Sequence, residues 1–256
     1  MVKTKQLPKR QRIRKALLLL SLLLFPVTLY YFSPALILQA AANGVVNASL
    51  IVFGLMFVAS LFVGRLWCGW ACPAGALQEV GAPINDKFSP GGKFNWIKWA
   101  IWIPWVGGIA VLAISAGGYR IIDPFFQLEG GATLALPVDG SGPPWYLIYY
   151  IIIALFLGLA LLFGRRAGCH SICWMAPFMI IGRKIRNLVR WPALRLEAEP
   201  SQCADCLRCT RTCPMSLDVH NMVQAADMEN SECILCGTCV DGCSQNAIRF
   251  SFSTGR

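Results

Sequence analysis

The sequence predicts a membrane all-α domain of four transmembrane helices in two repeats, followed by a small cytoplasmic α+β domain. Three observations predict this fold class: long uncharged apolar stretches, basic residues gathered on one side of them, and eight cysteines in two matching runs near the C-terminus. Only 14% of the 256 residues are charged and 56% are hydrophobic, a balance that soluble domains rarely have. Helices buried in a large soluble core are the alternative, which the length of the apolar stretches disfavours.

The apolar stretches set the expected spans. A helix needs about 20 apolar residues to cross about 30 Å of hydrocarbon. The first uncharged stretch, residues 16–64, is long enough for two such helices. Pro26, Pro34 and Pro104 should kink or shorten their helices, because proline lacks a backbone donor. We expect spans over residues 16–38, 45–64, 97–117 and 144–164.

Basic residues predict the orientation of these spans. Every Lys and Arg except Arg120 falls before the first expected span, between the second and the start of the third, where Lys98 lies, or after the fourth, which places those segments in the cytoplasm. We therefore expect a multi-pass protein of a bacterial-type inner membrane, with both termini cytoplasmic. The net charge of +10 then reflects topology and anionic lipid rather than nucleic acid, for which no basic-aromatic pattern is present. The start also resembles a signal peptide, but the run over residues 16–38 exceeds the usual limit of about 15 and favours an uncleaved anchor.

Two cysteine runs share the spacing C-x2-C-x2-C-x3-C, which holds cubane [4Fe–4S] clusters in bacterial-type ferredoxins. The fourth cysteine of each run ligates the other cluster in such domains. The predicted ligand sets are therefore Cys203, Cys206, Cys209 and Cys243 for one cluster, and Cys233, Cys236, Cys239 and Cys213 for the other. Structural zinc is the alternative, but two CxxC pairs would satisfy it and leave the remaining cysteines unexplained. Pro214 follows the first run and Ser244 the second, a change that removes no ligand.

These features divide the chain into four parts. The ferredoxin part is short for a hydrophobic core, so its clusters should supply some of its folding free energy. The basic amphipathic segment before it should lie along the inner membrane face. The expected parts are a basic cytoplasmic N-terminus at 1–15, a transmembrane domain at 16–164, an interfacial segment at 165–200 and a two-cluster ferredoxin domain at 201–256.

Four further cysteines form two CxxxC pairs, Cys68 with Cys72 and Cys169 with Cys173, each after a Gly-Arg at the end of an expected span. A parallel two-fold repeat would place the pairs side by side at the inner membrane face. Three hypotheses are open: a dithiol that cycles with a disulfide, a four-thiolate site for a metal or a further cluster, or buried small residues. All twelve cysteines fall on the expected cytoplasmic side, where thiols stay reduced, which favours metal or redox chemistry. His170, inside the second pair, is a further candidate ligand.

The sequence says less about a quinone site. Asp123 and Glu129 lie in an unusually apolar loop on the expected outer side. Such an acid is either a proton acceptor or an ordinary solvated loop residue.

The spans, Cys68-x3-Cys72-Pro73, Cys169-x3-Cys173 and the two ferredoxin runs together resemble a known family. The chain is similar to the membrane ferredoxin-type quinol dehydrogenases of the periplasmic nitrate reductase system (NapH type). It also resembles the membrane core of NosR and membrane polyferredoxins of cytochrome oxidase maturation. The second pair departs from the pattern, since its proline comes only at Pro177. The resemblance implies that quinol is oxidised in the membrane and that the electrons go on to a partner redox protein.

We therefore expect a membrane-bound iron–sulfur electron-transfer protein, a quinol dehydrogenase subunit that draws on the quinone pool. The partner would be a soluble ferredoxin, a cytochrome or a periplasmic reductase subunit. An alternative is an assembly or maturation factor that reduces a metal ion or a disulfide for a copper or haem enzyme, with the CxxxC cysteines as its working thiols. A third is a regulatory redox sensor. The direction of electron flow stays open, because cluster potentials range from about −700 to +450 mV.

Overall fold

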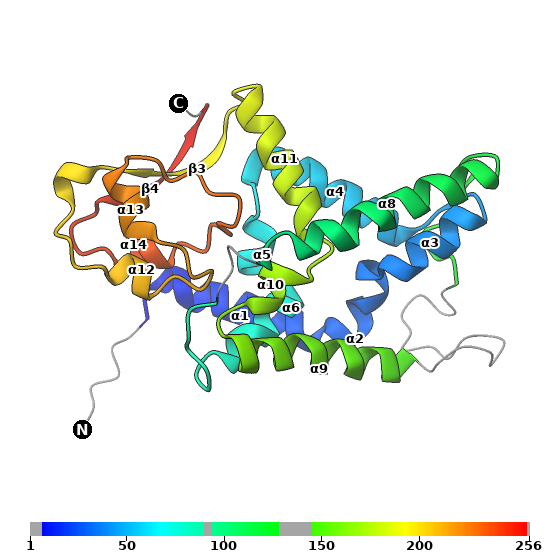
Figure 1. The fold of residues 1–256 in the computed structure, drawn as a ribbon, viewed down its shortest axis with the longest axis horizontal. Helices are drawn as coiled ribbons and strands as arrows, with labels where there is room; N and C mark the ends of the chain where they lie inside the picture. The colour runs from blue at the N-terminus through cyan, green and yellow to red at the C-terminus, as the bar shows by residue number, and fades with distance from the viewer. Residues whose placement is uncertain (1–6, 90–93, 128–144, 255–256) are drawn as a thin grey trace.

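The computed structural model describes residues 7–89, 94–127 and 145–254, and it is elongated, with a helical part and a small cysteine-rich part at one end (Figure 1). The helical part contains α1 (Lys9–Leu23), α2 (Phe25–Thr28), η1 (Leu29–Phe32), α3 (Pro34–Ala42), β1 (Val45–Val46), α4 (Ala48–Val63), α5 (Leu66–Trp70), α6 (Pro73–Gly81), α8 (Ile97–Ser115), β2 (Ile121–Ile122), α9 (Trp145–Phe163), α10 (Ala167–Ser171) and α11 (Ala176–Leu188). The small part contains β3 (Ala193–Ala198), η2 (Pro200–Gln202), α12 (Arg208–Arg211), α13 (Val219–Gln224), α14 (Thr238–Gly242) and β4 (Ile248–Ser253).

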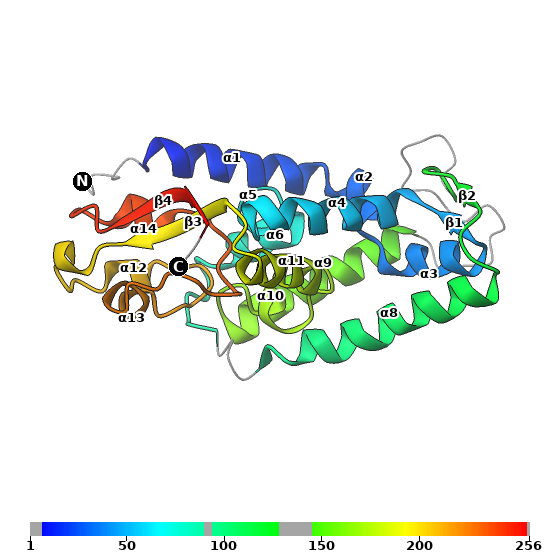
Figure 2. The same ribbon diagram turned by 90° about the horizontal axis from the view of Figure 1, so that it is seen from above.

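The first expected span is not one straight helix. Helix α1 begins at Lys9, earlier than predicted, and the chain bends by 61° between α1 and the segment Phe25–Phe32. Pro26 lies at this bend. Pro34 is the first residue of α3, and the Ser33 side chain caps this helix by accepting a hydrogen bond from the Leu36 amide. Both prolines interrupt the backbone hydrogen bonds that a continuous helix would need. The first half of α1 runs along the cysteine-rich part instead (Figure 2).

The prediction of four spans holds only in part. Among the described residues, α8 is long and apolar enough to cross a bilayer, and the bent pair of Lys9–Leu23 and Phe25–Phe32 adds one more at most. Helix α4 and the segment Leu147–Phe163 of α9 are apolar but shorter. Gly64 and Gly164 end these helices with positive φ angles of 56° and 93°, which glycine adopts without a steric penalty. The chain thus turns into the two CxxxC segments at the glycines where the second and fourth predicted spans end.

The expected internal repeat appears in the order of the elements. In each half a long helix, α4 or α9, leads to a short helix with the first cysteine of a CxxxC pair, and a helix with proline in its first turn follows. The halves interlock, because α11 packs along α4 while α6 packs along α9. Gly182 permits the first approach, since a Cβ there would lie 3.0 Å from the Phe57 carbonyl oxygen.

The cysteine-rich part begins earlier than the expected residue 201. Strands β3 and β4 pair antiparallel, with Ala193 opposite Ser253 and Ala198 opposite Ile248, so this part starts at Ala193. The segment before it also differs from an interfacial helix, because Arg183 and Arg186 of α11 are buried against protein. The exposed large apolar side chains of this segment lie in its second half, namely Ile185, Leu188, Val189 and Trp191.

Candidate metal centres

The two ferredoxin runs fold into loops of the same conformation. Asp205 and Leu207 in the first loop have φ angles of 51° and 56°, and Leu235 and Gly237 at the equivalent positions of the second have 51° and 74°. Turns of this kind direct successive backbone N–H groups toward one point and form a concavity that favours an anion. A short helix follows each loop, α12 in the first and α14 in the second.

Each loop lines its own cavity, and each cavity also receives the last cysteine of the other run. The structure thus brings together the predicted sets, Cys203, Cys206, Cys209 and Cys243 in one cavity and Cys233, Cys236, Cys239 and Cys213 in the other. A donor set of sulfur atoms alone suits an iron–sulfur cluster, which would supply one-electron transfer at these positions.

The two sets differ in exposure. Cys206 of the outer set is exposed, whereas Cys213, Cys236 and Cys239 of the inner set are buried. Burial raises the pKa of Cys213 to about 12, so this thiol stays protonated at neutral pH unless a metal stabilises its thiolate. The outer set lies at the end of the molecule with α12 and α13, far from α8 (Figure 1).

The structure also brings the two CxxxC pairs together in the core. Cys68, Cys72, Cys169 and Cys173 are all buried, with at most 7% of each residue exposed. Gln78 of α6 joins the pairs, because its Nε2 donates to Cys169 Sγ at 3.2 Å and its Oε1 accepts from the Gly168 amide at 2.9 Å. Burial raises the pKa of Cys173 to about 12, and Cys169 and Cys68 add to this effect through the repulsion between neighbouring thiolates.

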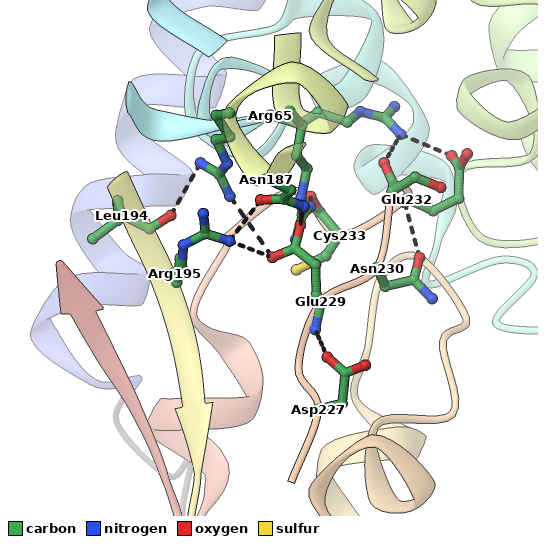
Figure 3. A network of polar contacts seen from close by, with 12 residues as sticks. Arg65, Asn187, Leu194, Arg195, Asp227, Glu229, Asn230, Glu232 and Cys233 are labelled. Atoms are coloured by element: carbon green, nitrogen blue, oxygen red, sulfur yellow. Dashed lines mark hydrogen bonds and ion pairs between the residues drawn. The ribbon is translucent and has the colours of Figure 1, made fainter. Parts of the chain in front are cut away.

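Two buried groups of charges flank these cysteines. In the first, Arg65 and Lys98 both bind Glu232, at 2.8 and 2.5 Å, and both cations are fully buried. Burial alone would raise the pKa of Glu232, but Arg65 and Lys98 outweigh it and lower the pKa to about 2. Glu232 precedes Cys233 in the inner ferredoxin loop, so this group ties the helical part to that loop (Figure 3).

In the second group, Arg14 and Arg166 share Glu79. Arg14 binds the carboxylate through two hydrogen bonds of 2.8 and 3.0 Å, and Arg166 Nη2 donates to it at 2.5 Å. Arg166 Nη1 also donates to the Cys68 carbonyl oxygen at 2.6 Å. Burial raises the pKa of Glu79, but Arg166 and Arg14 outweigh burial and hold it below its usual value. This carboxylate is therefore ionised at neutral pH.

A third group surrounds Glu229, ahead of the inner loop. The carboxylate of Glu229 pairs with Arg183 and with Arg195 at 3.3 Å, and it accepts from Asn187 at 2.9 Å (Figure 3). Arg183 also donates to the Cys233 carbonyl oxygen at 2.9 Å. Arg183 and Arg195 of the expected interfacial segment therefore bind Glu229 beside the inner ferredoxin loop.

The CxxxC pairs contact the inner ferredoxin loop directly. A Cβ added at Gly69 would lie 2.4 Å from the Ile234 carbonyl oxygen, and Trp70 Nε1 donates to the Leu235 carbonyl oxygen at 3.1 Å. From the other pair, His170 Nε2 lies 3.1 Å from the Met215 carbonyl oxygen. The inner set of ferredoxin cysteines thus sits between the CxxxC cysteines and the outer set.

Both histidines lie next to cysteine groups. Burial lowers the pKa of His170 to about 4, so the ring is neutral and carries one N–H. Its Nε2 lies 3.1 Å from the Met215 carbonyl oxygen, and its Nδ1 lies 3.2 Å from the side-chain amide of Asn95. It is therefore a neutral bridge to the cysteine-rich part rather than a ligand. His220 lies beside the outer set, where Nε2 contacts Asp205 Oδ1 at 2.8 Å and Cys203 Sγ is close to both.

Of the two loop acids, Asp123 accepts a hydrogen bond from the Phe125 amide at 3.0 Å, as in an ordinary turn, while Glu129 lies outside the described residues. The sequence does not reveal the buried charged groups. Arg65 and Arg166 follow Gly64 and Gly164 closely, and from the sequence they indicate only the orientation of the spans. Their one available signal was adjacency to the cysteines, and their partners Glu79 and Glu232 come from distant segments that only the fold brings near.

Two ferredoxin-type cysteine loops joined to a helical part with four further cysteines define an iron–sulfur electron-transfer protein. Comparison with known proteins agrees: a 4Fe-4S binding domain matches residues 47–90 and a 4Fe-4S dicluster domain matches residues 202–248. The first match covers Cys68 and Cys72, and the second covers all eight ferredoxin cysteines.

Three relatives show the same resemblance. The chain is 28% identical to the methylamine utilization ferredoxin-type protein MauN of Methylobacillus flagellatus, over 71% of this chain and 60% of that protein. It is 26% identical to the putative electron transport protein YccM of Escherichia coli, over 77% of this chain and 53% of that protein. It is 22% identical to the ferredoxin-type protein NapH of Haemophilus influenzae, over 73% of this chain and 62% of that protein.

The chain therefore spans between about half and two thirds of the length of these three curated relatives. The resemblance to NapH-type ferredoxin proteins that the cysteine motifs predicted is confirmed. No solved structure matches the chain.

Proposed function

We propose that this protein oxidises a membrane quinol in a cavity between α1 and α6 and delivers the electrons to a partner redox protein. The cavity carries the proposal: its volume of about 710 Å³ lies within the range of about 300–1,000 Å³ that small-molecule sites have. Leu18, Leu22, Ala76 and Val80 give it an apolar wall, and Glu79 gives it a carboxylate.

Access from a bilayer supports this assignment. Leu19 and Leu22 of α1 line the cavity, and Leu19, Leu20 and Leu23 expose about half or more of their surface on the same helix. Exposed leucines in such a row fit an acyl-chain environment. We accordingly place the helical part in a membrane, in multi-pass form with both termini in the cytoplasm.

The chemistry of the cavity suits a quinol. Oxidation of a quinol to a quinone releases two electrons and two protons. The ionised Glu79 accepts hydrogen bonds from Arg14 and Arg166 and can accept another from a quinol hydroxyl. Loss of an electron makes that hydroxyl strongly acidic, so a carboxylate with a low pKa can still take its proton and pass it to water. Iron–sulfur clusters supply single-electron transfer, and two equivalents of an oxidised one-electron carrier are reduced per quinol.

The order of the cysteine groups supports transfer of the electrons to the partner at the end of the molecule that holds the outer ferredoxin set. Gln78 lines the cavity and donates to Cys169, the CxxxC pairs contact the inner ferredoxin loop, and the outer set is the exposed one. Leu207 in the outer loop is 43% exposed beside Arg208 and Arg211. A partner with an acidic rim around its own cofactor would fit this end.

A maturation factor that reduces a metal ion or a disulfide is the alternative. It requires working thiols that a bulky substrate can reach. The burial of all four CxxxC cysteines, at 4 to 7% exposure, supports the electron-transfer proposal instead.

The test uses the full chain, purified anaerobically in detergent, with a water-soluble quinol as electron donor. Reduction of the clusters is followed by loss of visible absorption. Leu22→Trp fills the cavity, and Glu79→Gln removes its carboxylate. We expect each to slow reduction by quinol at least tenfold while reduction by dithionite, which needs no cavity, stays unchanged.

Leu55→Trp is the matched control, because Leu55 is 62% exposed on α4 and lies outside the cavity lining. Quinol reduction at the wild-type rate in both cavity variants would reject this site. Failure of quinol to reduce the wild-type protein under any condition would reject quinol oxidation itself.

A further inference from the structure

We infer that Cys68, Cys72, Cys169 and Cys173 together hold a third [4Fe–4S] cluster, between the cavity and the inner ferredoxin loop. The inference goes beyond the proposed function and does not depend on which molecule donates the electrons. It rests on the convergence of the two pairs, on the spacing of their sulfur atoms and on the charges around them.

The two pairs are built into one site. Gln78 follows the first pair and binds the second, while Arg166 precedes the second pair and binds the Cys68 carbonyl oxygen at 2.6 Å. A Cβ at Gly75 would lie 2.9 Å from Arg166 Nη1 and 3.0 Å from that same carbonyl oxygen. Each half thus contributes a side chain that reaches across to the other half. Neither pair alone offers more than two of the four thiolates that a cubane needs.

The spacing of the sulfur atoms favours a cluster over a single ion. A tetrahedral Zn²⁺ with Zn–S bonds of about 2.3 Å requires sulfurs about 3.8 Å apart. Within the described part of the chain, no three sulfurs of this group lie within 4.8 Å of one another, and the same holds for both ferredoxin sets. Thiolates that bind four different irons of one cluster must lie farther apart than those that share one ion. The CxxxC cysteines match the ferredoxin sets in this respect.

The buried charges call for an anion at this position. Arg65 and Lys98 share one carboxylate, Glu232, and Arg14 and Arg166 share another, Glu79. Each group of two cations and one anion therefore keeps one excess positive charge beside the cysteines.

Several arginine donors in these groups also lack partners among the described residues. Arg65 Nε, Arg65 Nη2 and Arg166 Nε are buried and make no hydrogen bond to that part of the chain. An uncompensated buried charge or donor is costly, whereas a thiolate-ligated cluster supplies negative charge and sulfur acceptors. A disulfide, or four neutral thiols, would leave these arginines as they are.

Two helix N-termini add to the same field. Cys72 is the residue directly before α6, and Cys173 lies three residues before the first residue of α11. The second cysteine of each pair therefore meets the positive end of the helix that follows it. This equivalence suggests that Cys173 has the same role as Cys72, although Trp174 replaces the proline that follows the first pair.

The decisive experiment counts metal in the full chain, purified anaerobically and quantified by amino-acid analysis. We expect about 12 irons and about 12 acid-labile sulfides per chain, since each cubane contains four of each. The double variant Cys72→Ser, Cys173→Ser should fall to about 8 of each. EPR spectra of the dithionite-reduced proteins should show that both ferredoxin signals persist in this variant.

A matched variant, Cys203→Ala with Cys243→Ala, should also fall to about 8 irons but should lose a different EPR signal. About 8 irons in the wild-type protein would overturn the inference, and so would 8 irons with one copper or zinc that disappears in Cys72→Ser, Cys173→Ser. If that variant does not fold, the wild-type count decides alone. No quinol is used, so the outcome is separate from the test of the cavity.

Discussion

Gly69 lies so close to Ile234 that a Cβ on the glycine would be 2.4 Å from the Ile234 carbonyl oxygen. This contact joins the first CxxxC pair to the loop between Cys233 and Cys236. The Trp70 hydrogen bond to Leu235 lies beside it. The backbones of the helical part and the ferredoxin part therefore meet here without an intervening side chain, which keeps the two cysteine groups close.

Gly69→Ala should separate these two groups. The methyl group must push either α5 or the inner loop aside, and overpacking of this kind costs about 1–3 kcal/mol. We expect a lower Tm and slower reduction of the ferredoxin clusters by quinol. Gly54→Ala is the control, because a Cβ at Gly54 would have no atom from another part of the described chain within 4 Å. An unchanged Tm and rate in Gly69→Ala would show that the contact is not tight.

Glu232→Gln should destabilise the protein strongly. Arg65 and Lys98 are both fully buried and both depend on this carboxylate, and removal of one partner from a buried ion pair costs about 3–5 kcal/mol. Thermal unfolding followed by circular dichroism measures the loss. Glu197→Gln breaks the exposed pair with Arg249 and should cost at most about 1 kcal/mol. Equal losses in the two variants would contradict the importance of the buried group.

Arg166→Gln tests the charge beside the CxxxC cysteines. An electron adds negative charge to a cluster, so the loss of a nearby buried cation should disfavour the reduced form and lower the reduction potential. A change of about 1.4 kcal/mol corresponds to about 59 mV for one electron, and we expect a shift of that order in an EPR-monitored titration. The signal lost in Cys72→Ser, Cys173→Ser should shift, while the outer ferredoxin signal should not.

Arg249→Gln is the charge-matched control for that titration, because Arg249 is exposed and pairs only with Glu197 among the described residues. Its potentials should match those of the wild-type protein. A shift of the same size in every signal of Arg166→Gln would indicate a general structural effect rather than a local charge.

Glu79 predicts a pH dependence of stability. Its pKa in the folded protein is below the ordinary value of 4.5, because Arg166 and Arg14 outweigh burial. Its ionised form therefore stabilises the fold fully above about pH 4.5, and the contribution is lost as the pH falls through the lower folded pKa. The difference in unfolding free energy between wild type and Glu79→Gln should be constant from pH 6 to 8 and shrink below pH 4.5. A constant difference down to pH 3 would contradict this.

The cysteine spacing was enough to predict the ferredoxin loops. Residues three or four apart must share one loop, so the chemistry of Cys203, Cys206 and Cys209 follows from local sequence. The CxxxC pairs were different. Their sequence left three hypotheses open, because Cys68 and Cys169 are about a hundred positions apart and their proximity depends on how α6, α9, α10 and α11 interlock.

The length of the apolar stretches predicted where helices lie, but not where they bend or break. Residues 16–38 were predicted to form one span, but the chain passes there through α1, α2, η1 and α3, with breaks next to Pro26 and Pro34. Gly64 and Gly164 end α4 and α9 where the predicted spans end. Hydropathy measures the environment of a segment and not its backbone path. The four apolar segments are helical as predicted, while their bends and their true lengths follow from single residues with special backbone preferences.

The iron–sulfur chemistry, the apolar character of the helical part and the resemblance to NapH-type proteins follow from the amino-acid sequence, because each depends on composition or on residues close together in the chain. Which charges lie beside which cysteines depends on how the helices pack. Arg65 meets Glu232 across 167 positions and Arg14 meets Glu79 across 65. Such pairs form when helices pack, since burial removes the water that would otherwise solvate each charge and leaves the partner across the interface as its only compensation.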